Sequence, residues 1–355
     1  MNKKIKYFLL LFFVAVFGCR EVFDFDYDEV PEGRVVIDGF ISDRGTSHVV
    51  RVSYSTTINE RDLVETRFVS DATVRVHDDQ GRTTQLTYDR AGMYKSAPLF
   101  RAEEGRSYQL EVVMPNGEVY ESAMKSLPPP SPARAEVTVV GDTRTILSNN
   151  QVADERGARA TSRVQQDGQV HYYQWLVGRL YVHNATQAFD EDLQFCYVRD
   201  LDLGRVQLLK DAPASPDQAT AYDYELDFIP VTAKMDVEYG VEARLLTLNL
   251  EDFEFWDFVR GQIENTGGLF DAAPFSIRGN ITNSATGEQA LGYFGVYRES
   301  VDRYFFQYAE LGFPAITVLP CITGPGAQVP NQCTDCRLFE TQENYGINRP
   351  AWWTN

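Results

Sequence analysis

Apolar and polar residues alternate strictly in the stretch Ala72-Thr73-Val74-Arg75-Val76-His77. It is followed by Asp78-Asp79-Gln80-Gly81, whose composition is typical of a tight turn, and then by a second run from Thr83 to Tyr88. Successive side chains of a β-strand point to opposite faces, so this alternation predicts two strands with one buried face each. The stretch therefore predicts an antiparallel hairpin within a half-buried sheet.

Similar runs surround this hairpin between residues 34 and 126. One earlier run spans Val35 to Ile41, and two later ones, Ser107–Met114 and Glu118–Met124, flank the turn sequence Pro115-Asn116-Gly117. About seven short strands in roughly ninety residues are typical of an immunoglobulin-like antiparallel β-sandwich. The region lacks the Cys–Trp–Cys pattern of immunoglobulin domains, so we predict only the architecture for residues 34–126.

A proline-rich segment separates this region from the rest of the chain. Residues 127–133 begin Leu127-Pro128-Pro129-Pro130-Ser131-Pro132, which predicts a stiff, extended linker. Residues 134–355 are predicted to form a second β-rich domain with one amphipathic helix, at about Leu250 to Asn265, and a disulfide-containing tail. Within it the polar stretch 141–168 has few aromatic residues, so we expect a long surface excursion or a mobile loop.

Composition excludes several classes of protein. The chain has 355 residues, 43% of them hydrophobic, and a formal net charge of −18. This hydrophobic content excludes a disordered polymer, and the length favours two domains. Proteins that bind nucleic acids need a basic face, so we expect no nucleic-acid partner.

The N-terminus predicts export and lipidation. Three lysines within the first six residues precede an apolar run, Tyr7 to Phe17, which is too short to span a bilayer and suits a signal peptide. The run ends in Val16-Phe17-Gly18-Cys19, and a small residue directly before a cysteine is typical of bacterial lipoprotein processing. We predict that residues 1–18 are a lipoprotein signal peptide and that Cys19 carries a covalent lipid anchor. An ordinary signal peptide or a short buried helix is the alternative.

Residues 19–33 form an acidic tether. The run Arg20 to Glu29 resembles the export tag of Bacteroidota surface lipoproteins, so we expect a protein anchored in the outer membrane and facing the cell surface. A plain acidic tether is one alternative. A calcium loop built on Asp24, Asp26 and Asp28 is another, although nothing downstream completes an EF-hand.

The other cysteines are Cys196, Cys321, Cys333 and Cys336. An even number in an exported chain predicts two disulfides. We expect Cys321 to close a local loop with Cys336 or Cys333, and the other of these two to pair with Cys196. The spacing of Cys333 and Cys336 also leaves a redox or a zinc site as alternatives, but the surrounding residues indicate a loop and the four histidines lie far upstream.

Motifs for catalysis are absent from the sequence. It contains no P-loop, G-x-S-x-G, H-E-x-x-H or G-x-G-x-x-G pattern. We therefore predict no enzymatic activity, no catalytic residues, no metal and no cofactor apart from the lipid on Cys19.

A few other residues have definite expectations. His171 lies in a predicted core strand, so we expect a packed histidine rather than a ligand. The helix acids are expected to form a solvated face; they are Glu251, Asp252, Glu254 and Asp257. Trp352 and Trp353 are candidates for a partner interface, with packing against the disulfide loop as the alternative.

Several short segments, in their order along the chain, resemble one family. They include Val36-Ile37-Asp38-Gly39, Asp71–Val76, Arg278-Gly279-Asn280-Ile281 and Cys333–Arg337. In this order they resemble a Bacteroidota surface-lipoprotein family known as domain of unknown function 4249. The resemblance implies an outer-membrane lipoprotein, often encoded beside a TonB-dependent transporter, and it implies no catalytic residues.

These observations lead to one functional expectation and its competitors. We expect a non-enzymatic accessory subunit that docks on a TonB-dependent β-barrel and aids substrate capture or gating. A structural subunit of an outer-membrane assembly or secretion complex is the alternative. A secreted hydrolase is a third hypothesis, for which the sequence offers no motif.

Overall fold

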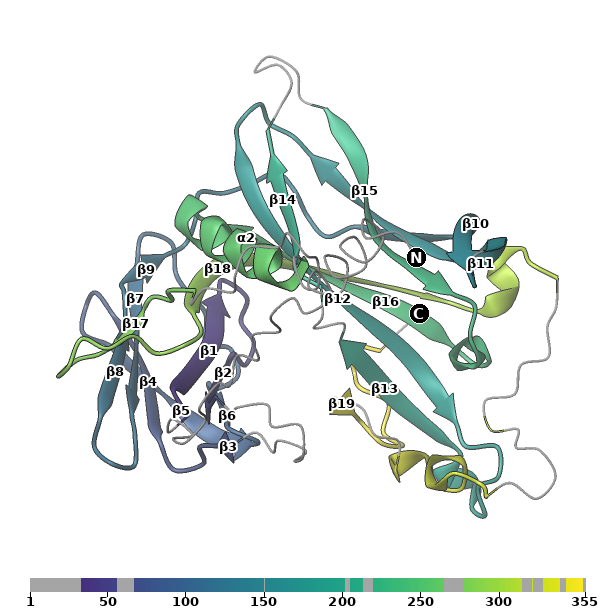
Figure 1. The fold of residues 1–355 in the computed structure, drawn as a ribbon, viewed down its shortest axis with the longest axis horizontal. Helices are drawn as coiled ribbons and strands as arrows, with labels where there is room; N and C mark the ends of the chain where they lie inside the picture. Colours follow the sequence, from purple (N-terminus) through teal and green to yellow (C-terminus); the bar gives the residue numbers. More distant parts are fainter. Residues whose placement is uncertain are drawn as a thin grey trace, which may run out of the picture.

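The computed structural model describes residues 33–55, 67–149, 151–201, 205–212, 220–264, 277–314, 321, 328–338 and 343–353. These residues form a mainly β fold: one large mixed sheet, a small three-stranded antiparallel sheet and a single α-helix, α2 (Leu250–Glu264) (Figure 1). No described helix is apolar and long enough to cross a bilayer. The predicted signal peptide 1–18, Cys19 and all but the last residue of the tether 19–33 lie outside the described residues.

The strands before the linker are short. They are β1 (Val35–Ser42), β2 (Val49–Tyr54), β3 (Arg67–Phe68), β4 (Thr73–Asp78), β5 (Thr83–Arg90), β6 (Met93–Lys95), β7 (Ser107–Val113), β8 (Val119–Ser122) and β9 (Lys125–Ser126). The predicted hairpin is confirmed, because β4 and β5 pair antiparallel around the Asp78–Gly81 turn.

The strands after the linker are longer on average. They are β10 (Val137–Ser148), β11 (Gln151–Gln165), β12 (His171–Asn184), β13 (Phe195–Leu201), β14 (Gln207–Asp211), β15 (Ala221–Pro230), β16 (Tyr239–Leu248), β17 (Ile281–Asn283), β18 (Phe294–Phe306) and β19 (Glu343–Asn344). Short 3₁₀ turns lie between them: η1 (Glu191–Leu193), η2 (Ala233–Met235), η3 (Tyr308–Leu311), η4 (Asn331–Cys333) and η5 (Cys336–Leu338).

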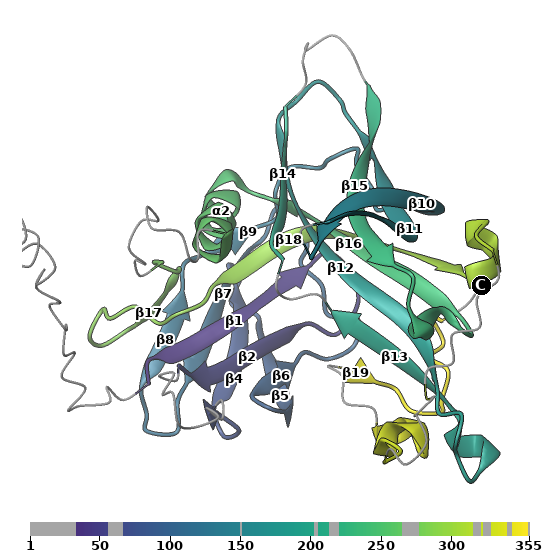
Figure 2. The ribbon, with the colours of Figure 1, turned by 45° about the vertical axis from the view of Figure 1, so that its right-hand side comes forward.

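The first half of the chain folds around one hydrophobic core. Strand β5 pairs with β4 through Leu86 and with β6 through Tyr88, so it links the strands on its two sides. Ile37 of β1, Val74 of β4 and Leu110 of β7 are fully buried in the same cluster. Strand β1 crosses in front of β4 and β7 in Figure 2.

Strand β18 joins the two halves. Its beginning runs parallel to β1, with Gly39 opposite Phe294, and its remainder pairs antiparallel with β16, starting at Arg298 opposite Thr247. Strand β17 also returns to the first half and pairs with β8. Segments far beyond the linker therefore add strands to the region 34–126, whose predicted boundaries stay a prediction.

The second half is layered on both faces of strand β12. Tyr173 and Trp175 pack toward the three-stranded sheet of β10, β11 and β15, in the largest core of this half. Leu176, on the opposite face, contributes to a smaller cluster with residues of α2 such as Trp256. The alternating side chains of one strand thus hold two covering layers.

Of the two expectations for the polar stretch 141–168, a surface excursion or a mobile loop, the mobile loop was wrong. Most of it lies in β10 and β11, which form a long antiparallel hairpin with Ser148 opposite Gln151. Both faces of its outer part are exposed, so its side chains show no apolar alternation. The hairpin is instead stabilised by cross-strand polar pairs such as Arg144 with Glu155 and Arg159 with Asp142.

Two disulfides form, as the even number of cysteines predicted. Cys321 pairs with Cys333 in a local loop, and Cys336 pairs with Cys196, 140 residues away. The C-x-x-C cysteines are thus bonded to other partners rather than to each other. All four lie in the C-terminal half, where the Cys196–Cys336 bond attaches the tail to β13.

We expect peptide mapping of unreduced protein to recover Cys196 linked to Cys336 and Cys321 linked to Cys333. The four sulfurs should react with an alkylating reagent only after reduction. Replacing Cys196 and Cys336 with serine should lower the free energy of unfolding by about 2–5 kcal/mol, because the bond closes a long loop. A Cys333–Cys336 peptide, or four free thiols before reduction, would contradict the pairing.

Candidate functional site

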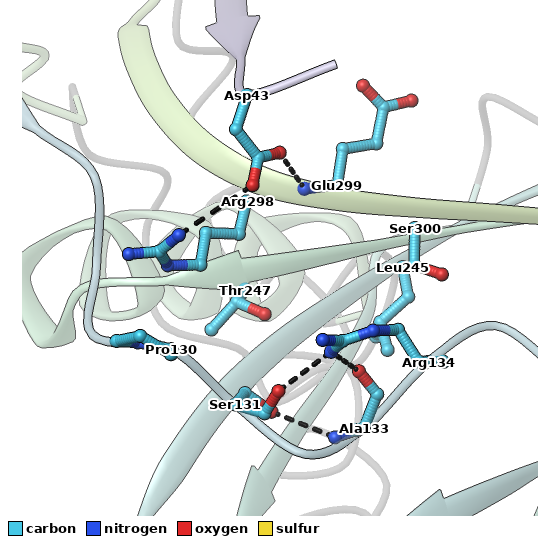
Figure 3. Close-up of a pocket in the computed structure, with 10 residues that line it drawn as sticks. All are labelled: Asp43, Pro130, Ser131, Ala133, Arg134, Leu245, Thr247, Arg298, Glu299 and Ser300. Carbon is cyan, nitrogen blue, oxygen red and sulfur yellow. Dashed lines mark hydrogen bonds and ion pairs between the residues drawn. The ribbon is translucent and has the colours of Figure 1, made fainter. Parts of the chain in front are cut away.

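A pocket of about 150 Å³ lies where the linker meets the two halves of the chain (Figure 3). We call it the junction pocket. Its lining comes from the end of β1, the linker and strands β16 and β18: Asp43, Pro130, Ser131, Ala133, Arg134, Leu245, Thr247, Arg298, Glu299 and Ser300. A pocket shared by both halves can respond to their relative position, so it is the best candidate site among the described residues.

Two arginines shape the pocket, and the linker backbone fixes both. Arg298 donates from Nε to the Pro128 carbonyl at 2.7 Å and also pairs with the Glu104 carboxylate. Arg134 donates from Nη1 to the carbonyls of Ser131 and Ala133, each at 2.7 Å (Figure 3). These linker carbonyls lie outside the strands, so side-chain donors satisfy them instead of a neighbouring strand.

The hydroxyl groups in the pocket are suited to binding rather than to nucleophilic attack. Ser131 Oγ lies 2.5 Å from the Tyr173 hydroxyl, so its nearest polar partner is not a general base. Burial raises the pKa of Tyr173 to about 12, with Asp211 adding to the effect and the hydrogen bond with Ser131 opposing it. Thr247 and Ser300 add two more hydroxyls to the lining, which contains no histidine or cysteine.

A buried carboxylate lies behind the pocket. Glu299 accepts hydrogen bonds from Arg244 Nε at 2.8 Å and from Ser42 Oγ at 2.6 Å, and Arg44 lies 3.7 Å away. Burial alone would raise the pKa of Glu299, but Arg244, Ser42 and Arg44 together outweigh burial and hold it below its usual value. Asp43 accepts the Glu299 backbone N–H at 2.9 Å, which ties the end of β1 to β18.

A second polar cluster attaches helix α2 to the first half, and it corrects one prediction. Asp252 was expected on a solvated face, yet its side chain is 0% exposed, whereas Glu251, Glu254 and Asp257 are exposed as predicted. It lies 3.0 Å from the ammonium of Lys125.

Tyr293 completes this Asp252 cluster. Its hydroxyl donates to Asp252 Oδ1 at 2.6 Å, while burial and then the Asp252 charge raise its pKa and keep it protonated. Lys125 is also buried and lies 5.1 Å above the Tyr293 ring. The cluster therefore holds the beginning of α2 against β9 and the segment before β18.

Each of the four histidines has a hydrogen-bond partner away from the junction pocket. His171 is buried, lies 2.9 Å from Asp167 and stacks on Tyr173, which confirms a packed residue. The other three each have a partner as well: His48 contacts the Phe100 carbonyl, His77 contacts Thr83 Oγ1, and His183 contacts the Gln332 carbonyl. In the described ranges, no group of three or more His, Cys, Asp and Glu residues is placed to hold a metal ion.

The two tryptophans near the end of the chain differ. Trp353 is 0% exposed, its Nε1 donates to Glu238 at 2.6 Å and its ring packs on Tyr197 and Phe305. It was an interface candidate, but in this position it belongs to the core. Trp352 remains half-buried, with the Arg303 guanidinium 4.3 Å above its ring.

Sequence reasoning missed the residues of the junction pocket. Arg134 and Arg298 are far apart in the chain, and they meet because the segment after the linker is hydrogen-bonded to Ser300 and Asp302 of β18. The linker prolines were a usable signal, because a stiff segment between two β regions tends to run along their boundary.

Removing the ammonium of the Asp252 cluster tests its stabilising role. We expect Lys125→Met to lower the free energy of unfolding by about 3–5 kcal/mol, because Asp252 is then buried without a cation. Lys125→Met combined with Asp252→Asn should recover part of this loss, as measured by urea denaturation. The control Glu254→Gln, at an exposed side chain of the same helix, should change stability by less than about 1 kcal/mol. Equal losses in the single and double variants would contradict a buried charge pair.

The depressed pKa of Glu299 predicts a pH-dependent contribution to stability. A carboxyl whose pKa is lower in the folded state stabilises fully above its unfolded pKa and loses this contribution as pH falls through the folded pKa. We therefore expect Glu299→Gln to destabilise by roughly 2 kcal/mol at pH 7, with the difference from wild type shrinking below about pH 4. Urea denaturation across this range measures it, and Glu104→Gln is the exposed control. A difference that stays constant down to pH 3 would refute the assignment.

Comparison with known proteins places the chain in a family. Residues 20–303 match the family described as domain of unknown function (DUF4249), and this match spans most of the chain. No curated protein matches the sequence. The chain therefore belongs to the DUF4249 family.

Proposed function

We propose that this DUF4249 protein is a lipid-anchored protein of the outer membrane, facing the cell surface, that acts as a non-enzymatic binding subunit of a TonB-dependent transporter. In this role it aids the capture of a substrate or the gating of the barrel. Cys19 carries the lipid, and the acidic tether 19–33 holds the folded part away from the membrane.

The chemistry of the junction pocket carries the proposal. Its guanidinium groups and hydroxyls can bind a polar group, while its buried serine, Ser131, is engaged by a tyrosine. Binding without reaction suits an accessory subunit better than an enzyme. The two disulfides support export, since such bonds persist in oxidising compartments.

The immunoglobulin-like description of residues 34–126 is part of the proposal. It is supported by β5, which pairs with both β4 and β6, and by the one core shared by β1, β2, β4 and β7. Two strands contributed from later in the sequence, β17 and β18, extend this arrangement.

A structural subunit of an outer-membrane assembly or secretion complex is the second candidate. It needs the same anchor and the same rigid β scaffold, but no ligand. The half-buried Trp352 beside Arg303 favours a role in contacts between proteins. The junction pocket favours the transporter role instead, because a purely structural subunit needs no pocket.

Affinity purification from gently solubilised outer membranes tests the proposal. We expect the tagged protein to recover one TonB-dependent barrel in stoichiometric amount, identified by mass spectrometry. Cys19→Ala should leave the protein unlipidated and shift it from the membrane to the soluble fraction. Recovery of assembly or secretion components would support the second candidate, and recovery of the protein alone would contradict both.

A further inference from the structure

Phe189 is the most exposed large hydrophobic residue of the described part of the chain. Its side chain is 95% exposed, in the loop between β12 and β13 that projects at the lower right of Figure 1. Burial of a phenylalanine side chain contributes about 1.5–3 kcal/mol of favourable free energy, and Phe189 does not gain this contribution within its own chain. Phe195 and Leu338 are exposed on segments that a disulfide joins to each other, next to this loop.

The loop that carries Phe189 is fixed by hydrogen bonds to the C-terminal tail. The backbone N–H of Gln187 donates to the Cys333 carbonyl, and its side-chain Nε2 donates to the Cys321 carbonyl, each at 3.0 Å. The two ends of the loop meet where Ala185 N donates to Gln194 O at 2.7 Å. Phe189 is thus presented on a braced loop rather than on a free one.

Both disulfides brace this loop. Cys321 and Cys333 are bonded to each other and supply the carbonyls that hold Gln187. Cys196, close after the loop, is bonded to Cys336 of the same tail. A contact residue that is rigid before binding loses little conformational entropy when it docks.

The surroundings of Phe189 are acidic. Asp190, Glu191 and Asp192 follow it directly, and all three are exposed. Arg337 is the nearby cation, and it is held by Asp335 at 2.7 Å. The loop therefore offers an apolar centre with a negative rim, which is complementary to an apolar pocket with a positive rim.

We propose that Phe189 is the anchor through which this protein docks on a partner protein, by entering an apolar pocket rimmed with lysine or arginine. A negatively charged membrane surface is disfavoured, because it would repel the three neighbouring carboxylates. The inference rests on the proposed function and deepens it, since it specifies the surface through which the accessory subunit contacts its partner.

Phe189→Ala is the first test, because an exposed side chain can be removed without harm to the core. We expect thermal unfolding to be unchanged and affinity for the outer-membrane partner, measured with the purified components, to fall by about 30-fold or more. Leu99→Ala is the matched control, at a residue 79% exposed in the other half of the chain. It should leave the affinity unchanged.

Charge reversal and cross-linking complete the test. Replacing Asp190, Glu191 and Asp192 with lysine should slow association and remove much of its dependence on salt. A photo-reactive benzoylphenylalanine at position 189 should cross-link to a partner peptide that lines an apolar pocket with basic residues around it.

The outcomes separate the two proposals. If the wild-type protein recovers its barrel and Phe189→Ala binds it equally well, the anchor is wrong and the accessory role stands. Cross-links only to lipid or glycan would also overturn the anchor. If wild type recovers no partner, the proposed function fails, and the anchor fails with it.

Discussion

The fold depends on the point at which β18 changes partner. The strand leaves β1 after Tyr297 and pairs with β16 from Arg298 onward, so a single backbone runs through both halves. Glu299 lies directly after this change and is buried between Ser42 of the first half and Arg244 of the second. A buried carboxylate needs hydrogen-bond and charge partners. Glu299 therefore favours the arrangement of the two halves in which Ser42 and Arg244 both reach it.

The interactions that hold the first half in place differ in kind from those that hold the C-terminal tail. Among the described residues the first half contains no disulfide. Besides the pairing of β18 with β1 and of β17 with β8, two polar clusters attach it to the second half: the Glu299 cluster, and Lys125 with Asp252 at the beginning of α2. One covalent bond, Cys196–Cys336, attaches the C-terminal tail to β13, and a second, Cys321–Cys333, closes a loop within the tail. Acid therefore weakens the Glu299 cluster, whereas a reductant releases the tail from β13.

Much of the local structure could be predicted from the sequence, because a strand with one buried face shows apolar residues at every second position. The β4–β5 hairpin, helix α2 and the even set of cysteines are examples. The β10–β11 hairpin could not be predicted in this way, since it is exposed on both faces and its stabilising pairs join residues that look like those of a loop. Asp252 and Trp353 were misplaced because charge and position in the chain do not reveal burial. The junction pocket depends on strand pairing between distant segments, which no local pattern encodes.

The parallel pairing of β1 with β18 joins segments from the two ends of the described chain. Ser42 and Glu299, which meet at the end of this pairing, are 257 residues apart. A chain that emerges from its N-terminus must keep β1 without its partner until almost the whole sequence has appeared, and contacts of such long range form slowly. The open edge of β1 is meanwhile a site for mispairing with other strands. Folding of the first half is therefore a late event, completed by a strand from the last quarter of the chain.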